Sequence, residues 1–242
     1  ALKLEPKSAR AHAVLGNRYL EYEWNWPAAR RELQIALELA PHDSTVLGQV
    51  AQERVVMGHP EEALQYIDSA LAIDPLDAGR HFARNWSCLR LGRYADGEAS
   101  ARRALEISPT YAYGRYFLAL PLLLQGKAAE ALAELGKETE PGAQLMGFAL
   151  AYHALGQREK ADAALARLEE EHGEYFAMYI AEAYAFRGDK DLAFEWLERA
   201  LAQRDINLFF IKQEVLFAPL EDDPRYQAFL RKMKRPIRPR IF

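Results

Sequence analysis

The residues that most often carry enzyme chemistry are dispersed along this chain. The six histidines are His12, His42, His59, His81, His153 and His172. No two of them, and none together with Cys88, have the short spacing of paired metal ligands. The chain also lacks the G-x-G-x-x-G, G-x-S-x-G and H-E-x-x-H patterns that hold phosphates, nucleophiles and zinc. We therefore predict a non-enzymatic protein with no metal and no cofactor.

Acidic residues form three short clusters that could pair carboxylates for acid–base catalysis. The clusters are Glu61 and Glu62, Glu169 to Glu171, and Asp222 and Asp223. Adjacent positions on a helix do not face each other, and charge runs are usual on solvated helix faces and at helix N-termini. We expect these clusters to be solvated.

The composition indicates a large apolar core and a charged surface. Of the 242 residues, 50% are hydrophobic and 27% are charged, which excludes a disordered chain. The single cysteine, Cys88, cannot form an intramolecular disulfide. The sequence shows no signal-peptide pattern, and its longest apolar run, Tyr116 to Leu124, is too short to cross a bilayer. These features predict a cytoplasmic protein without membrane contact.

The net charge of -4 conceals an acidic body and a basic end. Residues 231–242 contain no acidic residue and six basic ones, Arg231, Lys232, Lys234, Arg235, Arg238 and Arg240. The rest of the chain has 25 positive charges against 35 negative ones. Because a body of that sign repels phosphates, we expect no nucleic-acid partner. Residues 234–242, interrupted by prolines, are predicted to form an extended basic tail.

A phrase that ends in proline recurs with a period of 34 or 35 residues. Pro6, Pro41, Pro75 and Pro109 each close a copy of the pattern A-L-x-[LI]-x-P. Ala and Leu favour helix and proline cannot continue the helix before it, so each phrase predicts a helix end. A glycine followed about five residues later by a small residue predicts a tight turn between closely packed helices. These glycines are Gly58, Gly92, Gly126, Gly156 and Gly188.

This unit resembles the tetratricopeptide repeat, in which two antiparallel helices occupy 34 residues. The second copy matches the family pattern at Leu47, Val50, Ala51, Gly58, Ala63, Ile67, Ala70 and Pro75. The resemblance implies an all-α fold, a right-handed α-solenoid of about six helix-turn-helix repeats over residues 7–205. Residues 1–6 are predicted to be the end of a truncated upstream repeat, so we expect the chain to be a piece of a longer protein.

The third and fourth repeats depart from this pattern. Asn85 and Gly97 stand where small residues or alanine are usual. Pro121 falls within the expected first helix of the fourth repeat, where it removes a backbone hydrogen bond and crowds the carbonyl four residues earlier. The sequence therefore predicts a kink near Phe117.

Residues 206–233 are predicted to form a capping segment for the last repeat. Pro224 can occupy the first turn of a helix, on which Tyr226, Phe229, Leu230 and Met233 form one apolar stripe. The segment resembles the closing part of repeat regions in bacterial signalling proteins. In those families such regions follow DNA-binding, nucleotide cyclase or protein kinase domains.

In stacked helix pairs the first helix of each pair lines the concave face, where partners usually bind. The repeat pattern places many aromatic and Met side chains on that face, and such side chains are common interface anchors. The predicted groove consists of Arg10, Asn17, Phe82, Trp86, Arg90, Tyr113, Tyr116, Leu120, Met146, His153, Tyr175, Met178, Tyr179 and Glu182. Two alternatives stay open: these rings fill the tight inside of the superhelix, or the C-terminal segment covers them.

Three functional hypotheses follow from this pattern. The leading one is a scaffold that binds a peptide or partner protein in the concave groove. The second is a sensory region of a bacterial transcription regulator, nucleotide cyclase or kinase, which binds a small effector or mediates oligomerisation. Homo-oligomerisation through the same apolar face is the third.

Overall fold

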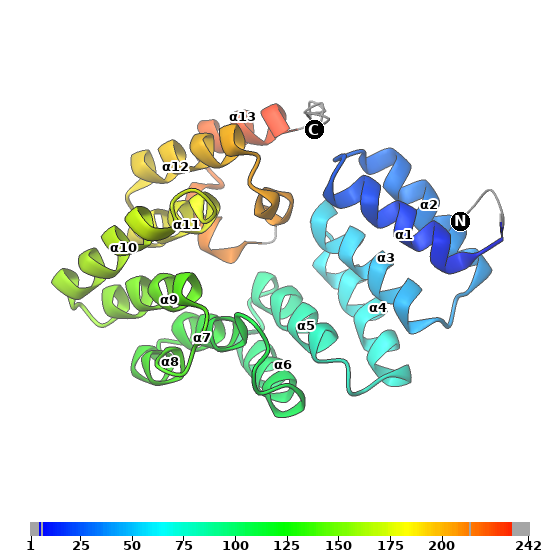
Figure 1. Ribbon diagram of the computed structural model, residues 1–242, viewed down its shortest axis with the longest axis horizontal. Coiled ribbons are helices and arrows are strands. Elements are labelled where there is room, and N and C mark those ends of the chain that lie inside the picture. The colour runs from blue at the N-terminus through cyan, green and yellow to red at the C-terminus, as the bar shows by residue number, and fades with distance from the viewer. Residues whose placement is uncertain (1–4, 6, 213, 234–242) are drawn as a thin grey trace.

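The protein is a curved array of helix pairs (Figure 1). The computed structural model describes residues 5, 7–212 and 214–233, and every regular element in that part of the chain is helical. Six pairs follow one another: α1 (Ala9–Glu21) and α2 (Trp26–Leu39), α3 (Ser44–Met57) and α4 (Pro60–Ile73), α5 (Ala78–Arg90) and α6 (Tyr94–Ile107), α7 (Gly114–Leu124) and α8 (Ala128–Leu135), α9 (Pro141–Ala154) and α10 (Arg158–His172), and α11 (Ala177–Arg187) and α12 (Lys190–Gln203). This is the all-α solenoid that the repeat pattern predicts. The expected upstream remnant at residues 1–6, apart from Glu5, and the basic tail at residues 234–242 lie outside the described residues.

Short polar residues two positions after the closing prolines start the first helix of the early pairs. The side chains of Ser8, Asp43 and Asp77 accept hydrogen bonds from backbone amides in the first turns of α1, α3 and α5. Such caps satisfy amides that have no partner within the helix. Gly58 ends α3 with a φ of 83°, a left-handed conformation that a side chain would disfavour. The caps after the closing prolines and the turn glycine therefore specify where such a first helix starts and ends.

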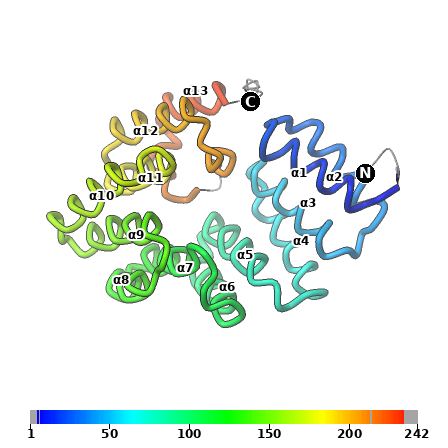
Figure 2. Tube along the Cα trace, in the orientation of Figure 1, coloured from blue at the N-terminus to red at the C-terminus, as the bar shows by residue number. Residues whose placement is uncertain are grey.

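The odd-numbered helices form the inner layer of the array. Besides the contacts within each pair, contacts run from α1 to α3 and on through α5, α7 and α9 to α11. Because successive odd-numbered helices are the closer neighbours, they lie on the tighter side of the curve. Figure 2 shows this curve, with α1 and α2 at one end and α12 and α13 at the other.

After α12 the chain turns back across the inner layer. Two 3-10 turns, η1 (Ile206–Phe210) and η2 (Val215–Leu220), precede the last helix, α13 (Pro224–Met233). The helix α13 packs against α12, whereas η2 packs on α11 and η1 reaches α3. In Figure 1 this part is orange and lies between α11 and the N-terminal helices. We call residues 206–212 and 214–220 the returning segment, because they connect the last helix pair with the second one.

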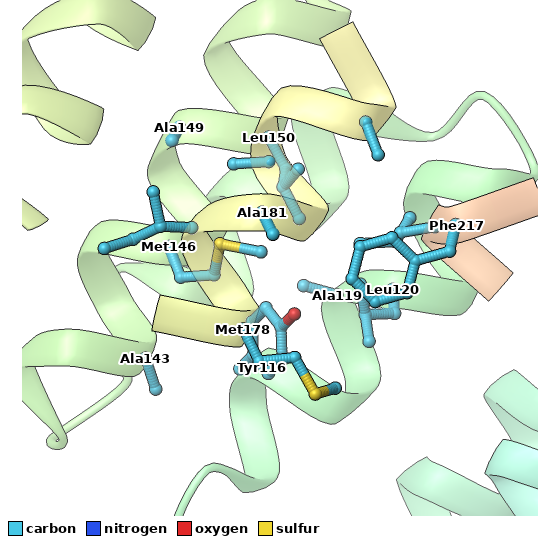
Figure 3. Close-up of a cluster of buried hydrophobic side chains, with 14 of the residues drawn as sticks. Tyr116, Ala119, Leu120, Ala143, Met146, Ala149, Leu150, Met178, Ala181 and Phe217 are labelled. Carbon is cyan, nitrogen blue, oxygen red and sulfur yellow. The ribbon is translucent and has the colours of Figure 1, made fainter. Parts of the chain in front are cut away.

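Aromatic side chains anchor the returning segment at both ends. Phe209 is buried in one cluster with Val56 of α3. Phe217 is fully buried in a second cluster with Leu120 of α7 and Leu150 of α9 (Figure 3). Full burial of such a side chain stabilises the folded state by about 1.5–3 kcal/mol. The segment therefore occupies part of the inner face where a separate partner could otherwise pack.

The unusual residues of the third and fourth pairs act together around the backbone carbonyl of Phe117. Pro121 lies inside α7 and leaves the carbonyl of Phe117 without its helical partner. The side chain of the buried Asn85 donates a hydrogen bond of 3.2 Å to that carbonyl. Gly97 makes room for it, since a Cβ there would lie 2.9 Å from Asn85 Oδ1. The helix continues past Pro121 to its end at Leu124, and the kink near Phe117 stays a prediction.

Replacing Asn85 with alanine should lower the free energy of unfolding by about 1–2 kcal/mol, because the Phe117 carbonyl then lies buried without a donor. Pro121→Ala restores a backbone N–H that can donate to the same carbonyl. In the double variant the effect of Asn85→Ala should therefore fall below about 0.5 kcal/mol.

Urea unfolding of the wild type, the two single variants and the double variant measures this coupling. Gln34→Ala is the control, because Gln34 is exposed and its side chain donates a hydrogen bond to Glu38 on the same helix. Additive effects of the two substitutions would contradict the role assigned to Asn85.

Candidate ligand-binding pocket

A cavity of about 370 Å³ lies on the inner layer, between the early helix pairs and the returning segment. We call it the inner pocket. Its lining residues are Gly48, Ala51, Gln52, Val55, Ile67, Gly79, Arg80, Phe82, Ala83, Trp86, Tyr111, Phe117, Tyr179, Phe210 and Glu214. They come mainly from α3 and α5, with one residue each from α4, the loop before α7, α7 and α11, and two from the returning segment. The volume suits a small molecule or one large side chain, but not a whole helix.

Aromatic rings that hold one another in place form much of the pocket wall. Phe117 packs edge-on against Trp86 and Phe82, with ring centroids 5.4 and 5.2 Å apart. The ring of Tyr111 lies 4.7 Å from that of Phe82. Edge-to-face pairs of this kind are favoured by the ring quadrupoles. Trp86, Tyr111 and Phe117 stay partly exposed, so this wall is both ordered and accessible.

The two arginines nearest the inner pocket each have a carboxylate partner. Arg80 Nε lies 3.4 Å from Asp77 Oδ2. The guanidinium of Arg80 also crosses Gly48, where a Cβ would come within 1.7 Å of Nη1, so only glycine permits this position. Arg90 forms an ion pair with Glu221. The positive charge beside the pocket is therefore already compensated.

Glu214 is a buried carboxyl group in the wall of the pocket. The residue is 4% exposed, and among the described residues its Oε2 atom makes no hydrogen bond. Burial raises the pKa of Glu214 to about 8, although the charge of Arg90 opposes the rise. Burial thus favours the protonated form of this carboxyl group at neutral pH.

A second carboxyl group, that of Glu182 on α11, lies close enough to Glu214 to feel its charge. Glu182 is fully buried, and in the described part of the chain neither of its carboxylate oxygens has a hydrogen-bond partner. Burial and the charges of Glu214 and Asp205 raise the pKa of Glu182 well above its usual value. The hydroxyl of Tyr116 lies nearby and acts in the opposite direction, but its geometry does not make a hydrogen bond.

The structure brings three predicted groove residues together in the inner pocket, namely Phe82, Trp86 and Tyr179. Five others require a correction, because they are buried in the core and offer no surface to a partner. These are Tyr116, Leu120, Met146, Met178 and Glu182. The first four lie in the cluster that includes Phe217 of η2, which packs on α11 (Figure 3). The returning segment therefore interrupts the continuous groove that the repeat pattern predicts.

The remaining predicted residues do not line the inner pocket. They are Arg10, Asn17, Arg90, Tyr113, His153 and Tyr175. Arg10 is exposed and lies 3.2 Å from Asp43, and Asn17 lines a separate open hollow beside α1. Tyr113 and His153 pack against neighbouring rings, whereas Tyr175 is 71% exposed.

Sequence reasoning missed several pocket residues, including Tyr111, Phe117, Phe210 and Glu214. Phe117 follows Tyr116 by one position, and the repeat register marks only the first of the two. The available signal was the density of aromatic residues between positions 111 and 117. Phe210 and Glu214 lie outside the repeats, so no repeat register could place them.

The described residues hold neither a metal-binding cluster nor a membrane-spanning helix. There, no three His, Cys, Asp or Glu side chains gather as they would to hold a metal ion. In the same part of the chain, no helix has the length and apolar character needed to cross a membrane.

Solved structures of tetratricopeptide-repeat proteins share this architecture. One from Parabacteroides merdae aligns with a TM-score of 0.68 at 16% identity and covers 88% of each chain. A thermophilic one from Thermus thermophilus aligns with a TM-score of 0.55 at 20% identity, over 70% of this chain and 98% of that one. PilW, described as a widely conserved type IV pilus biogenesis factor, aligns with a TM-score of 0.63 at 22% identity, over 70% of this chain and 80% of that one. No family model matches the chain.

The raised pKa of Glu214 predicts how stability depends on pH. Between the ordinary carboxyl pKa and about pH 8, the folded state binds more protons than the unfolded state, so the stability of the folded state falls as the pH rises. Glu214→Gln cannot ionise and should lose less stability over that range.

Urea unfolding at pH 5 to pH 8 measures the difference between the two proteins. The gap should widen with pH in favour of Glu214→Gln. Glu195→Gln, at an exposed position of α12, is the control and should follow the wild type. Parallel curves for the wild type and Glu214→Gln would show that Glu214 ionises normally.

Proposed function

We propose that this chain, a solenoid with the tetratricopeptide-repeat fold, is a non-enzymatic scaffold that binds a peptide or protein partner at its inner pocket. The fold supports a binding role, since stacked helix pairs present extended concave surfaces to partners. The proposal assigns no catalytic step, metal or cofactor to the chain.

The observation that carries the proposal is the aromatic wall of the inner pocket. Trp86 and Phe117 are held by mutual packing yet remain partly exposed, which is typical of residues that dominate binding energy in interfaces. The pocket admits one large side chain of a partner. The rest of the partner can extend along the first helix pair, where Val14 and Tyr22 are 70% and 68% exposed.

Selection from a random peptide library tests this function. Peptides that share a large anchor side chain should bind the wild type, and Trp86→Ala should weaken their binding at least about tenfold. Tyr175→Ala is the matched control, because Tyr175 is an exposed ring outside the pocket.

Calorimetry provides the affinities, and circular dichroism verifies that both variants keep their helix content. Selected peptides that bind Trp86→Ala as tightly as the wild type would count against the proposal, as would the absence of any enriched sequence.

A specific feature also favours a second function, the sensing of a small effector. The inner pocket is bounded by the returning segment through Phe210 and Glu214. A small molecule in it would contact the repeats and the returning segment at once. Such a ligand would therefore stabilise the contact between the two ends of the array.

A thermal-shift screen of small metabolites separates the two functions. An effector should raise the unfolding midpoint of the wild type, because it binds only the folded state, and Trp86→Ala should remove the shift. Peptide binding without any such shift would leave the protein partner as the ligand.

A further inference from the structure

We propose that the inner pocket recognises an organic cation, an alkylammonium or guanidinium group, which pairs with Glu214 between the aromatic rings. The inference rests on the proposed binding function and specifies the chemical group that enters the pocket. The same group occurs in the side chain of a lysine or arginine in a peptide and in small free amines.

Two buried carboxyl groups that are not paired with the nearby arginines carry this assignment. Glu214 and Glu182 are two buried carboxyl groups, and neither forms an ion pair with Arg80 or Arg90. Arg80 and Arg90 lie close by, but each is paired with a different carboxylate. A buried carboxyl group without a partner is unfavourable. A cationic ligand would supply the charge that neither arginine provides.

The aromatic wall adds to the attraction for a cation. A cation within about 6 Å of a ring centroid is attracted by the ring quadrupole, and tryptophan is the strongest of the three aromatic side chains in this respect. Trp86, Phe117 and Tyr179 all line the pocket together with Glu214. An anionic ligand in the pocket would instead lie beside the carboxyl groups of Glu214 and Glu182, and its charge would oppose their ionisation. A neutral ligand would leave Glu214 protonated and would form no ion pair with it.

Binding of the cation should release a proton. Burial raises the pKa of Glu214, and the charge of Arg90 on α5 lowers it. The charge of Glu214 in turn raises the pKa values of Glu182 and Tyr179 on α11, Tyr116 on α7 and Tyr226 on α13, so these titratable groups lie around it. Because burial raises the pKa of Glu214 to about 8, its carboxyl group is mostly protonated at pH 7 in the free protein. A bound cation lowers this pKa, so the group ionises as the ligand enters.

Calorimetric titration with n-butylguanidinium and its neutral isostere n-butylurea tests the assignment. The cation should bind the wild type at least about tenfold more tightly than the urea. Glu214→Gln should abolish this preference, and Glu195→Gln, at an exposed position of α12, should keep it. Because guanidinium stays charged throughout, its affinity should rise from pH 6 to about pH 8 and then level off.

Two further titrations refine the result. N-acetylarginine methylamide distinguishes the sources: tighter binding than n-butylguanidinium supports a peptide side chain, and weaker binding supports a small free cation. Titration of the wild type at pH 7 in two buffers of different ionisation enthalpy measures the released proton and requires no variant. Proton release supports the pairing with Glu214.

Several outcomes would overturn the assignment. They are equal binding of n-butylurea and n-butylguanidinium, no binding of either cation at millimolar concentration, an unchanged preference in Glu214→Gln, and binding without proton release. If selected peptides still need Trp86 in that case, the proposed function stands and only the cation assignment fails. Loss of peptide binding as well would overturn both.

Discussion

The apolar face of each helix pair is buried only when a neighbouring element covers it, and this requirement governs the whole chain. Along the solenoid, each pair covers the one before it. At the C-terminal end, α13 packs on α12 and η2 packs on α11. Phe217 then completes the core around α7 and α9, where it is fully buried. The last turns of the chain thus act as a structural partner for its own repeats.

The path of the returning segment determines the chemistry of the inner face. It packs on α3 and α11 and so covers part of the inner face that the repeats alone would expose. It also places Glu214 near Glu182 and beside the rings of the third and fourth pairs. The aromatic rings belong to the repeats, but the acidic group among them comes from outside the repeats. The inner pocket is therefore a product of both parts of the chain.

The candidate site could be predicted only in part. The sequence predicts Phe82, Trp86 and Tyr179, because the position of a residue within a regular repeat indicates on which face of its helix it lies. Glu182 lies on a predicted face, but η2, which is not part of the repeat, packs on the helix that carries it. The bond from Asn85 to the Phe117 carbonyl is a similar case, since two unusual residues are visible in the sequence but their pairing is not.

The amino-acid sequence by itself determined the helix pairs, their ends and their order. These features depend on local signals, namely helix-forming residues, the prolines that end the helices and caps such as Asp43. Because each signal acts over a few residues, it can be recognised in the sequence alone. Only the tertiary structure decided which inner residues remain accessible, because that depends on contacts between distant parts of the chain. Arg90 and Glu221 are 131 residues apart, and Phe209 packs with Leu20. No repeating pattern specifies such contacts, since they arise from the path that the chain takes after α12.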